Sequence, residues 1–493
     1  MISTNLPVLQ VVIPLMAAPI CVIIRQSTLS WIFATLVCFI SFFISCLLFN
    51  HVQMEGTLSY AIGGWVAPWG IEYVIDKLTI YILLIVTGLA SLIILGGRES
   101  LSYEIASDRL YLFYAAYLLN LTGLLGVIVT GDAFNVFVFI EIASLSSYAM
   151  ISISRDRRSL YAAFKYLILG TIGASFILVA IGLLYVVTGT LNMADLYQRL
   201  PDVQNHRTLM IALVFFTVGI GLKAAVFPLH LWLPDAYTYS PSMVSTFLAG
   251  TTTKVFLYVL IRFIFSIFGY EYVINQATLN YLLMFMACGA ILYGSVQAIR
   301  QDSIKRLLAY SSIAQIGYMV LGISIATESG LSAGLIHIFN HAIIKVSLFL
   351  TISTIIYHTG TDSIKQLAGL AKTMPVVMAM FLISGLSLIG VPLTTGFISK
   401  WYLIKAAFNA GYWPLVILVV FSSMLAVIYI WKIIEAAYFK TAESGGFKII
   451  EKQATPYLLY IILAIFVFAN IYFGLETSFS VDVAIQIAHG FMG

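Results

Sequence analysis

Charged residues are scarce along this chain, and their scarcity restricts the fold more than any other feature of the sequence. Asp, Glu, Lys and Arg make up 9% of the 493 residues, whereas 61% are apolar. A soluble domain carries charge at roughly a quarter of its positions. Most of the surface must therefore face lipid, and we expect one membrane domain over residues 1–493.

Apolar segments long enough to cross a bilayer recur along the whole chain. A hydrocarbon core about 30 Å thick requires about 20 apolar residues in a helix. Because a helix pairs its own backbone amides, an all-α polytopic fold with about fourteen transmembrane helices is predicted. The predicted spans are residues 7–24, 29–49, 78–96, 110–130, 134–153, 161–187, 208–227, 241–267, 277–298, 305–327, 331–357, 374–397, 412–438 and 456–474.

Basic residues alternate between the predicted loops. The loops after odd-numbered spans carry most of them, whereas the opposite loops hold mainly Lys77, Arg199 and Arg207. By the positive-inside rule, both termini are predicted to lie outside the cell's inner (plasma) membrane. The basic-loop residues are Arg25, Arg98, Arg109, Arg155, Arg157, Arg158, Arg300, Lys305, Arg306, Lys365, Lys372, Lys440, Lys448 and Lys452.

Two further segments can be interpreted from the sequence. The polar stretch 50–77 contains Gly63-Gly64-Trp65, which predicts a short outer hairpin. The N-terminus lacks the features of a signal peptide, so the first span is expected to be retained.

Charge and composition also restrict the partners and cofactors of this chain. A net charge of +4 without a basic aromatic run argues against nucleic acid. Four scattered cysteines and no phosphate-binding glycine loop predict no metal and no cofactor in this chain.

A short pattern repeats at a distance of 171 residues. Thr188-Gly189-Thr190 after span 6 matches Thr359-Gly360-Thr361 after span 11, and Gly131-Asp132 resembles Gln301-Asp302. Five predicted helices separate a position in the first copy from the matching position in the second. Because five is odd, the two copies are predicted to have opposite orientations in the membrane, as in many transporters. The two predicted repeats are residues 110–267 (spans 4–8) and 277–438 (spans 9–13).

Two spans contain residues that break helices. Span 7 is interrupted at Pro228, and span 12 contains Gly390, Pro392 and Gly396. A proline removes one backbone donor and frees the carbonyl four residues earlier, which here belongs to Ala224. We therefore predict that helices 7 and 12 are broken.

Four ionisable residues lie within apolar spans, where a charge costs about 2.5–3.5 kcal/mol. Glu141 is in the middle of span 5, Lys223 precedes the break in span 7, and Lys254 is inside span 8. Lys400 closes span 12. Each has a structural alternative: an ion pair for Glu141, snorkelling for the buried lysines, and an outer-interface position for Lys400.

Span 11 carries a polar stripe. His337, His341 and Lys345 are spaced four residues apart and share one helix face. A lone histidine is usually a packing residue, but three ionisable groups in line predict a proton relay. His230 and Asp235 border the loop between spans 7 and 8, where a proton inlet and a solvated-loop role are equally open.

Burial gives these groups a chemical role. Desolvation disfavours the charged form of a side chain, so a buried lysine releases its proton more readily than it does in water. A carboxylate nearby has the opposite effect. If Glu141 contacts Lys223, opening and closing that pair is a switch that would drive a proton along Lys254, the histidine stripe and Lys400.

Four segments resemble one family of membrane proteins. Gly131–Glu141 is similar to a motif of the D-type chain of Mrp-type multisubunit sodium/proton antiporters. Lys223–Ala236 resembles the hallmark of the wider family, which includes antiporter-like subunits of respiratory complex I and of membrane-bound hydrogenases. His337–Ala342 and Gly390–Lys400 fit the same family.

The resemblance implies a role for each buried residue. It assigns Glu141 and Lys223 to a coupling pair, Lys254 to a central relay and Lys400 to terminal proton exchange. A lysine at position 400 is similar to the D-type antiporter chain and to complex I subunits of the L and N kind, but not to the M kind. Ser144–Tyr148 is similar to the N kind.

The expected function is that of a proton-translocating subunit of a multisubunit monovalent cation (Na+)/proton antiporter. Its expected partners are other membrane subunits, the lipid bilayer, protons and Na+, and it is expected to be a transporter subunit rather than an enzyme. The alternative is an N-like proton-pumping membrane subunit of a redox enzyme of the complex I or hydrogenase type. Proton supply for carbon dioxide hydration and a stand-alone metabolite carrier are two further alternatives.

Overall fold

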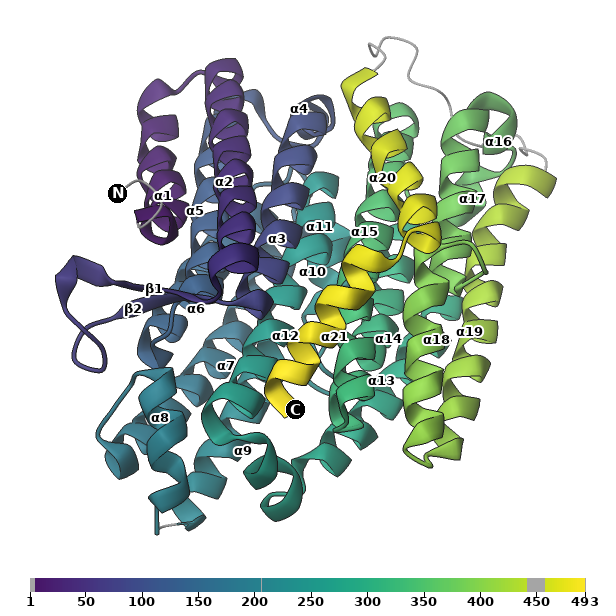
Figure 1. Cartoon of the computed structure of the whole chain (residues 1–493). Helices are drawn as coiled ribbons and strands as arrows, with labels where there is room; N and C mark the ends of the chain where they lie inside the picture. The colour runs from purple at the N-terminus through teal and green to yellow at the C-terminus, as the bar shows by residue number, and fades with distance from the viewer. Residues whose placement is uncertain (1–4, 205, 441–456, 493) are drawn as a thin grey trace.

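The computed structural model describes residues 5–204, 206–440 and 457–492. Helices account for most of the described residues, and one two-stranded sheet, β1 (Leu58–Ala61) and β2 (Glu72–Ile75), projects from them (Figure 1). The helices are α1 (Leu6–Ile24), α2 (Ser27–Glu55), α3 (Lys77–Gly96), α4 (Arg98–Glu104), α5 (Leu110–Val129), α6 (Ala133–Ser152), α7 (Arg158–Thr188), α8 (Met193–Arg199), α9 (His206–Lys223), α10 (Leu233–Tyr239), α11 (Ser242–Phe247), α12 (Thr253–Arg262), α13 (Leu279–Arg300), α14 (Ile304–Ser324), α15 (Glu328–Thr359), α16 (Leu370–Thr373), α17 (Pro375–Ile389), α18 (Thr395–Asn409), α19 (Trp413–Ile434), α20 (Tyr457–Leu475) and α21 (Ser478–Met492).

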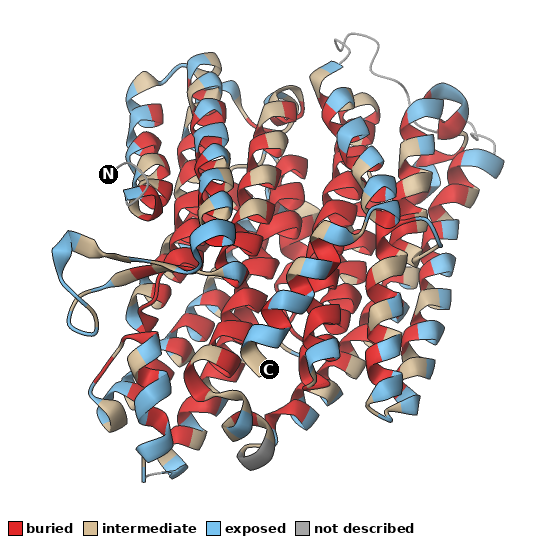
Figure 2. Ribbon diagram, viewed as in Figure 1, coloured by how far each residue is buried: buried red, intermediate tan, exposed pale blue. Residues whose placement is uncertain are grey.

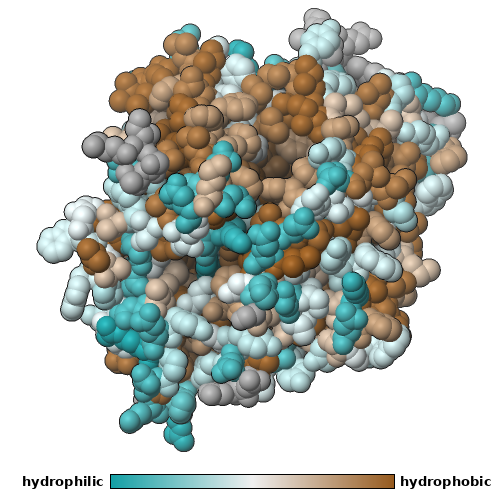
Figure 3. Space-filling view, viewed as in Figure 1, coloured by the Kyte–Doolittle hydropathy of each residue, from teal (hydrophilic) through white to brown (hydrophobic). Residues whose placement is uncertain are grey.

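Most of these helices are long and apolar enough to span a membrane. Thirteen helical segments in the described part of the chain meet that requirement, and the pair α17 and α18 supplies the fourteenth predicted crossing. The long helices stand side by side, and apolar side chains cover much of the surface (Figures 1 and 3). The chain is a multi-pass membrane protein, and the prediction of an all-α polytopic fold is confirmed.

Burial is concentrated in the middle of the bundle. The most apolar stretch of α15 is buried throughout, whereas only a third of the corresponding stretch of α19 is buried (Figure 2). Helices at the two flanks therefore present one side to lipid or to other proteins. The polar stripe of α15 lies at the centre of the molecule.

The two ends of the bundle differ in character. One end, which we call the basic face, bears Arg25, α4, the loop before α7 and the loop before α14. There Arg98 donates to Thr28 at 3.0 Å, and an isolated β-bridge joins Ile105 to Ser154. The other end, the hairpin face, bears β1, β2, α8 and residues 263–276. The predicted hairpin is present, with Leu58 opposite Ile75.

The pattern that repeats 171 residues apart forms the same contacts in both places. The Ala133 amide donates to the Leu191 carbonyl at 2.8 Å, and the Ile304 amide donates to the Asp362 carbonyl at 2.9 Å. The first contact lies at the hairpin face and the second at the basic face. This reversal supports two inverted copies, which we retain as a proposal.

The structure differs from the predicted spans at three places. α9 ends at Lys223 rather than at residue 227, and the second half of the broken span 12 continues to Asn409 rather than to residue 397. α21 was not predicted, because it is short and amphipathic. Two predicted basic-loop residues, Lys448 and Lys452, lie outside the described residues.

Candidate functional site

The break in span 7 lies beside the first buried lysine. α9 ends at Lys223, and Ala225 has a left-handed φ of 56° that turns the chain away from the helix. The indole of Trp232 donates to the Leu222 carbonyl at 2.7 Å. The Leu222 carbonyl, next to Lys223, therefore accepts both this indole and, at 3.4 Å, the Ala225 amide. The predicted release of the Ala224 carbonyl stays a prediction, although α9 ends earlier than Pro228 requires.

Lys223 and Glu141 form an ion pair between α9 and α6. Lys223 Nζ lies 3.0 Å from Glu141 Oε1 and donates to the Ser144 hydroxyl at 2.7 Å. The lysine side chain is fully buried, while 27% of the glutamate side chain is exposed. This is the contact that the switch hypothesis requires. Ser144 follows Glu141 by three residues, so both face the lysine from one side of α6.

Lys254 follows a widened turn in the middle of its span. Residues Leu248–Thr252 form a π-helical turn, and Lys254 Nζ donates to the Ala249 carbonyl within it. π-Helical turns inside α-helices are frequent at functional sites. Gly250 permits close approach to α15, since a Cβ there would lie 2.6 Å from Val346. Lys254 thus lies next to the helix that bears the histidine stripe.

The two histidines of the α15 stripe lie next to each other, and Lys345 is bonded to α14. The His337 and His341 ring centroids are 5.9 Å apart, and Lys345 Nζ donates to the Leu308 carbonyl at 2.8 Å and to Ser311 at 2.5 Å. Among the described residues, neither ring nitrogen of His341 has a hydrogen-bond partner. Such a buried imidazole requires water or a moving proton for its polar atoms.

Lys400 occupies the break in span 12. Its Nζ donates to the last two carbonyls of α17, Leu388 at 3.1 Å and Ile389 at 2.8 Å, and to the Ser423 hydroxyl at 3.1 Å. Lys400 is 5% exposed and lies in the second half of the broken span, so the outer-interface alternative does not describe its position. A lysine ammonium at a helix C-terminus is favoured by unpaired carbonyls and by the helix dipole.

Uncharged side chains connect Lys400 to the stripe. His337 Nδ1 lies 2.8 Å from the Ser399 hydroxyl, and the ring of Tyr318 lies 5.5 Å from that of His337. Lys400 Nζ lies 5.2 Å from the same Tyr318 ring. In the described part of the chain, no hydrogen bond joins the Glu141–Lys223 pair to Lys254. Contacts therefore bring His337 and Lys400 to the same Tyr318 ring, whereas among the described residues no hydrogen bond joins Lys254 to His341 either.

His230 and Asp235 have different surroundings. His230 is 2% exposed, and its ring lies 5.4 Å from Phe227 and 5.0 Å from Tyr293. Asp235 forms ion pairs with Lys165 at 2.7 Å and with Arg306 at 3.5 Å. Among the described residues, no hydrogen bond or ion pair joins His230 to Asp235. Their role as a proton inlet stays a prediction.

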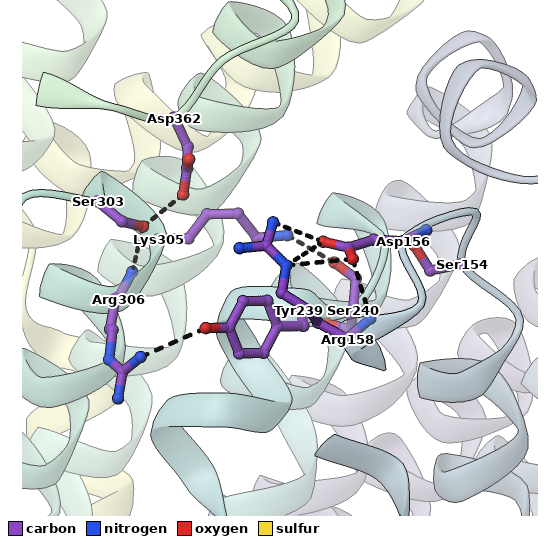
Figure 4. Close-up of polar contacts among 9 residues, drawn as sticks. All are labelled: Ser154, Asp156, Arg158, Tyr239, Ser240, Ser303, Lys305, Arg306 and Asp362. Carbon is purple, nitrogen blue, oxygen red and sulfur yellow. Dashed lines mark hydrogen bonds and ion pairs between the residues drawn. The ribbon is translucent and has the colours of Figure 1, made fainter. Parts of the chain in front are cut away.

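Sequence reasoning missed several charged residues. Lys165 could have been found as a lysine within a long apolar span, whereas Lys305 was assigned only to a basic loop. Lys305 is 4% exposed, and its Nζ donates to the Ser240 carbonyl at 2.5 Å. It lines a cleft of about 360 Å³ in the basic face, together with Asp156 and Arg158 (Figure 4). Cations and carboxylates from several loops meet in this cleft.

Arg158 controls the charge of a carboxylate in the cleft. Burial of Asp156 raises the pKa of its carboxyl, but hydrogen bonds and the charge of Arg158 outweigh that effect and hold the pKa below its usual value. The shortest of these contacts joins Arg158 Nη2 to Asp156 Oδ2 at 2.8 Å. The carboxylate therefore stays ionised at neutral pH.

The described residues contain no group of three His, Cys, Asp or Glu side chains that could hold a metal ion. What they contain is a set of lysines, histidines and one glutamate within the membrane helices, with Lys223 and Lys400 at helix breaks. This arrangement defines a multi-pass membrane protein with a polar axis through its centre. Residues 130–426 match the family described as NADH:quinone oxidoreductase/Mrp antiporter, TM, and the chain belongs to that family.

Individual relatives come from two branches of this family. The chain is 41% identical over 454 residues to the N-type subunit of the NADH-quinone oxidoreductase of Desulforudis audaxviator, covering 90% of this chain and 88% of the relative. It is 33% identical over 370 residues to the D-type chain of the Na(+)/H(+) antiporter of Alkalihalophilus pseudofirmus, covering 75% and 74%. The predicted family resemblance is confirmed.

Two solved structures share the fold. A chain of the membrane-bound sulfane sulfur reductase, an archaeal respiratory membrane complex, superposes with a TM-score of 0.90 at 30% identity, covering 99% of this chain and 98% of that one. A chain of the Mrp complex from Dietzia sp. superposes with a TM-score of 0.89 at 22% identity, covering 100% and 98%. Both are chains of multisubunit membrane complexes.

Proposed function

We propose that this chain is the proton-translocating subunit of a multisubunit monovalent cation/proton antiporter that exchanges Na+. Family membership and the relatives described as D-type chains of Na(+)/H(+) antiporters support this function. The observation that carries it is the Glu141–Lys223 ion pair at the broken end of α9. An ion pair next to a helix break, with its lysine buried and its glutamate partly exposed, can open without disrupting a continuous helix.

In the proposed cycle, opening of the ion pair makes Lys223 release its proton, because the carboxylate no longer stabilises the ammonium. The proton crosses the gap to Lys254 by way of water and then follows His341, His337 and Lys400. Closing the pair restores the protonated lysine. Because Lys223 is the proton donor and no hydrogen bond among the described residues joins it to Lys254, the gap before Lys254 is the proposed control point.

The proposed orientation places the basic face in the cytoplasm and the hairpin face outside the plasma membrane, following the positive-inside rule. The cleft at Lys305 then opens to the cytoplasm, and Asp235 adjoins it through its ion pair with Arg306. Other membrane subunits would cover part of the apolar flanks. The proposed partners in transport are protons and Na+.

The proposal is tested with the assembled complex in inverted vesicles, by a pH-sensitive dye that reports proton flux after addition of NaCl. Lys223→Ala and Lys400→Ala should each abolish Na+-dependent flux. Lys405→Ala removes an exposed lysine of α18 and should leave the flux unchanged. Unaltered flux in both first variants, with normal assembly, would contradict the proposed sites.

A second function is favoured by the N-type relative from an NADH-quinone oxidoreductase, which is 41% identical. In that case the same proton path would serve a redox enzyme whose partner chains carry out the electron transfer. The two functions are separated by giving the vesicles either an Na+ gradient or a quinone with an electron donor. Proton flux only with the donor would favour the redox complex.

A further inference from the structure

α12 carries a line of polar residues that extends away from the proposed relay. Tyr258 and Arg262 follow Lys254 at intervals of four residues, so the three share one face of the helix. The exposed fractions of Lys254, Tyr258 and Arg262 are 0%, 3% and 9%. At 1.5 Å per residue, Arg262 lies about 12 Å along the axis from Lys254, toward the hairpin face.

Three helices fix the guanidinium of Arg262. Its Nη2 donates to the carboxylate of Asp76 and, at 2.8 Å, to the Thr79 hydroxyl at the start of α3. Its Nε donates to the Tyr258 hydroxyl at 3.0 Å, and that hydroxyl donates to the Ile128 carbonyl of α5 at 2.6 Å. Arg262 is therefore held in one position by α3, α12 and, through Tyr258, α5.

A cavity lies directly against this network. It has a volume of about 400 Å³, and its lining includes Tyr258, Arg262, Glu72 and Thr130. Phe491 of α21 also lines it, with its ring 6.0 Å from the guanidinium. Because Tyr258 is one helical turn from Lys254, the cavity approaches the proposed relay to within about 6 Å along the axis.

The short distance between the cavity and Lys254 would allow protons to leak from the proposed relay. A water-filled cavity one turn from a proton-carrying lysine offers protons a short circuit to the hairpin face. A fixed positive charge in a narrow passage repels protons and cations. Arginine suits this task because it stays protonated in proteins and does not relay a proton as lysine does.

We infer that the Asp76–Arg262 pair, together with Tyr258, is an electrostatic plug that prevents protons from passing between Lys254 and the cavity at the hairpin face. Asp76 holds the guanidinium across the passage, and Tyr258 fills the space beneath it. The inference rests on the proposed role of Lys254 as a proton relay. It assigns the outer half of α12 to insulation of the path rather than to conduction.

The test is passive proton leak in liposomes that contain the assembled complex. A pH gradient is imposed without an Na+ gradient or an electron donor, and an internal dye reports its decay. Arg262→Gln and Asp76→Asn should each speed the decay at least about fivefold, since the barrier charge is lost or released. Arg262→Lys should keep most of the barrier, because it retains a cation. Arg199→Gln breaks an exposed ion pair with Asp195 on the same face and should leave the decay unchanged.

Two double variants make the test specific. Lys254→Ala combined with Arg262→Gln should abolish the extra leak, because the path behind the plug is then removed. Asp76→Arg combined with Arg262→Asp restores a cation across the passage and should reduce the leak again. An unchanged decay in Arg262→Gln with normal assembly, or a leak that persists without Lys254, would overturn the inference.

The leak assay is independent of the transported ion. If the wild-type complex shows no Na+-dependent flux, the antiporter proposal fails, but the comparison of leak rates still applies. If Na+-dependent flux is normal and the Arg262→Gln complex does not leak, the plug alone is wrong.

Discussion

The lysines at the two helix breaks are held by different partners. Lys223 is paired with the Glu141 carboxylate at 3.0 Å, whereas Lys400 donates to the last two carbonyls of α17. Each lysine also donates to one serine hydroxyl, that of Ser144 or Ser423. The two sites thus differ mainly by one negative charge. Where a lysine is paired with a carboxylate, movement of that carboxylate controls whether the lysine keeps its proton. A lysine held only by neutral dipoles is suited to releasing its proton.

Removal of the carboxylate is the strongest test of this difference. In Glu141→Gln, Lys223 remains buried without its counter-ion, so we expect proton-coupled flux to fall about 100-fold, which corresponds to about 2.7 kcal/mol. The flux is measured in vesicles with matched amounts of complex. Glu141→Asp keeps the charge on a shorter side chain and should retain part of the flux. Equal flux in Glu141→Gln and wild type would show that the two lysine sites do not differ in this way.

The break around Lys400 depends on a close approach of backbone atoms. A Cβ added at Gly396 would overlap the Ser387 carbonyl, so Gly396→Ala must push α18 away from α17. Overpacking of this kind costs about 1–3 kcal/mol, and we expect a loss of about 30-fold in flux together with a lower melting temperature of the complex.

Gly182→Ala is the matched control for that substitution. It is a helical glycine in α7 whose added Cβ would meet nothing within 4 Å. We expect its flux and melting temperature to match those of the wild type. A normal Gly396→Ala complex would mean that the carbonyl cage around Lys400 is not built by this contact.

A carboxylate can be introduced into the second site to make it resemble the first. Ser423→Asp would place a negative charge next to Lys400 Nζ, which lies 3.1 Å from the serine hydroxyl. Because the ammonium is then stabilised, we expect slower proton release and about tenfold lower flux at neutral pH. The flux should recover as the pH rises. Ser423→Asn has a similar size without the charge, and an equal loss in that variant would rule out the electrostatic cause.

The serine hydroxyls should have the smallest effects. Ser144→Ala and Ser423→Ala each remove one hydrogen bond to a buried ammonium, worth about 1 kcal/mol, so we expect up to about fivefold lower flux. The loss should be larger for Ser423→Ala, since no carboxylate in the described part of the chain pairs with Lys400 to compensate. Flux is measured across a pH series for both variants. The reverse order would indicate that Lys400 is held mainly by the α17 carbonyls.

Hydropathy was sufficient to predict most of the fold. Because charge-poor runs of about 20 residues favour helices in lipid, most predicted spans agree with the observed helices within a few residues, and the broken span 12 is the main exception. The end of α9 could not be predicted, because it depends on Trp232 reaching the Leu222 carbonyl across the break. Hydropathy did not predict α21, because only the face that packs on α15 is apolar and its other face is polar.

Only the ionisable residues of the candidate site were predicted from the sequence. Lysines, histidines and a glutamate are conspicuous in apolar spans, and the Glu141–Lys223 contact was a hypothesis that the structure bears out. Tyr318, Ser399 and Ser423 give no such signal, because serine and tyrosine are ordinary components of membrane helices. They connect to their partners across tens of residues in the chain, and only the packing of α14, α18 and α19 brings them there.

The burial of the central stretch of α15 has a consequence for biosynthesis. This helix has 32 residues, and its central stripe contains two histidines and a lysine, so its transfer from the translocon into lipid is unfavourable for a lone helix. Its favourable surroundings are created by neighbours, of which α14 is translated before it and α17 and α18 after it. α15 should therefore remain near the translocon until the helices that follow have emerged.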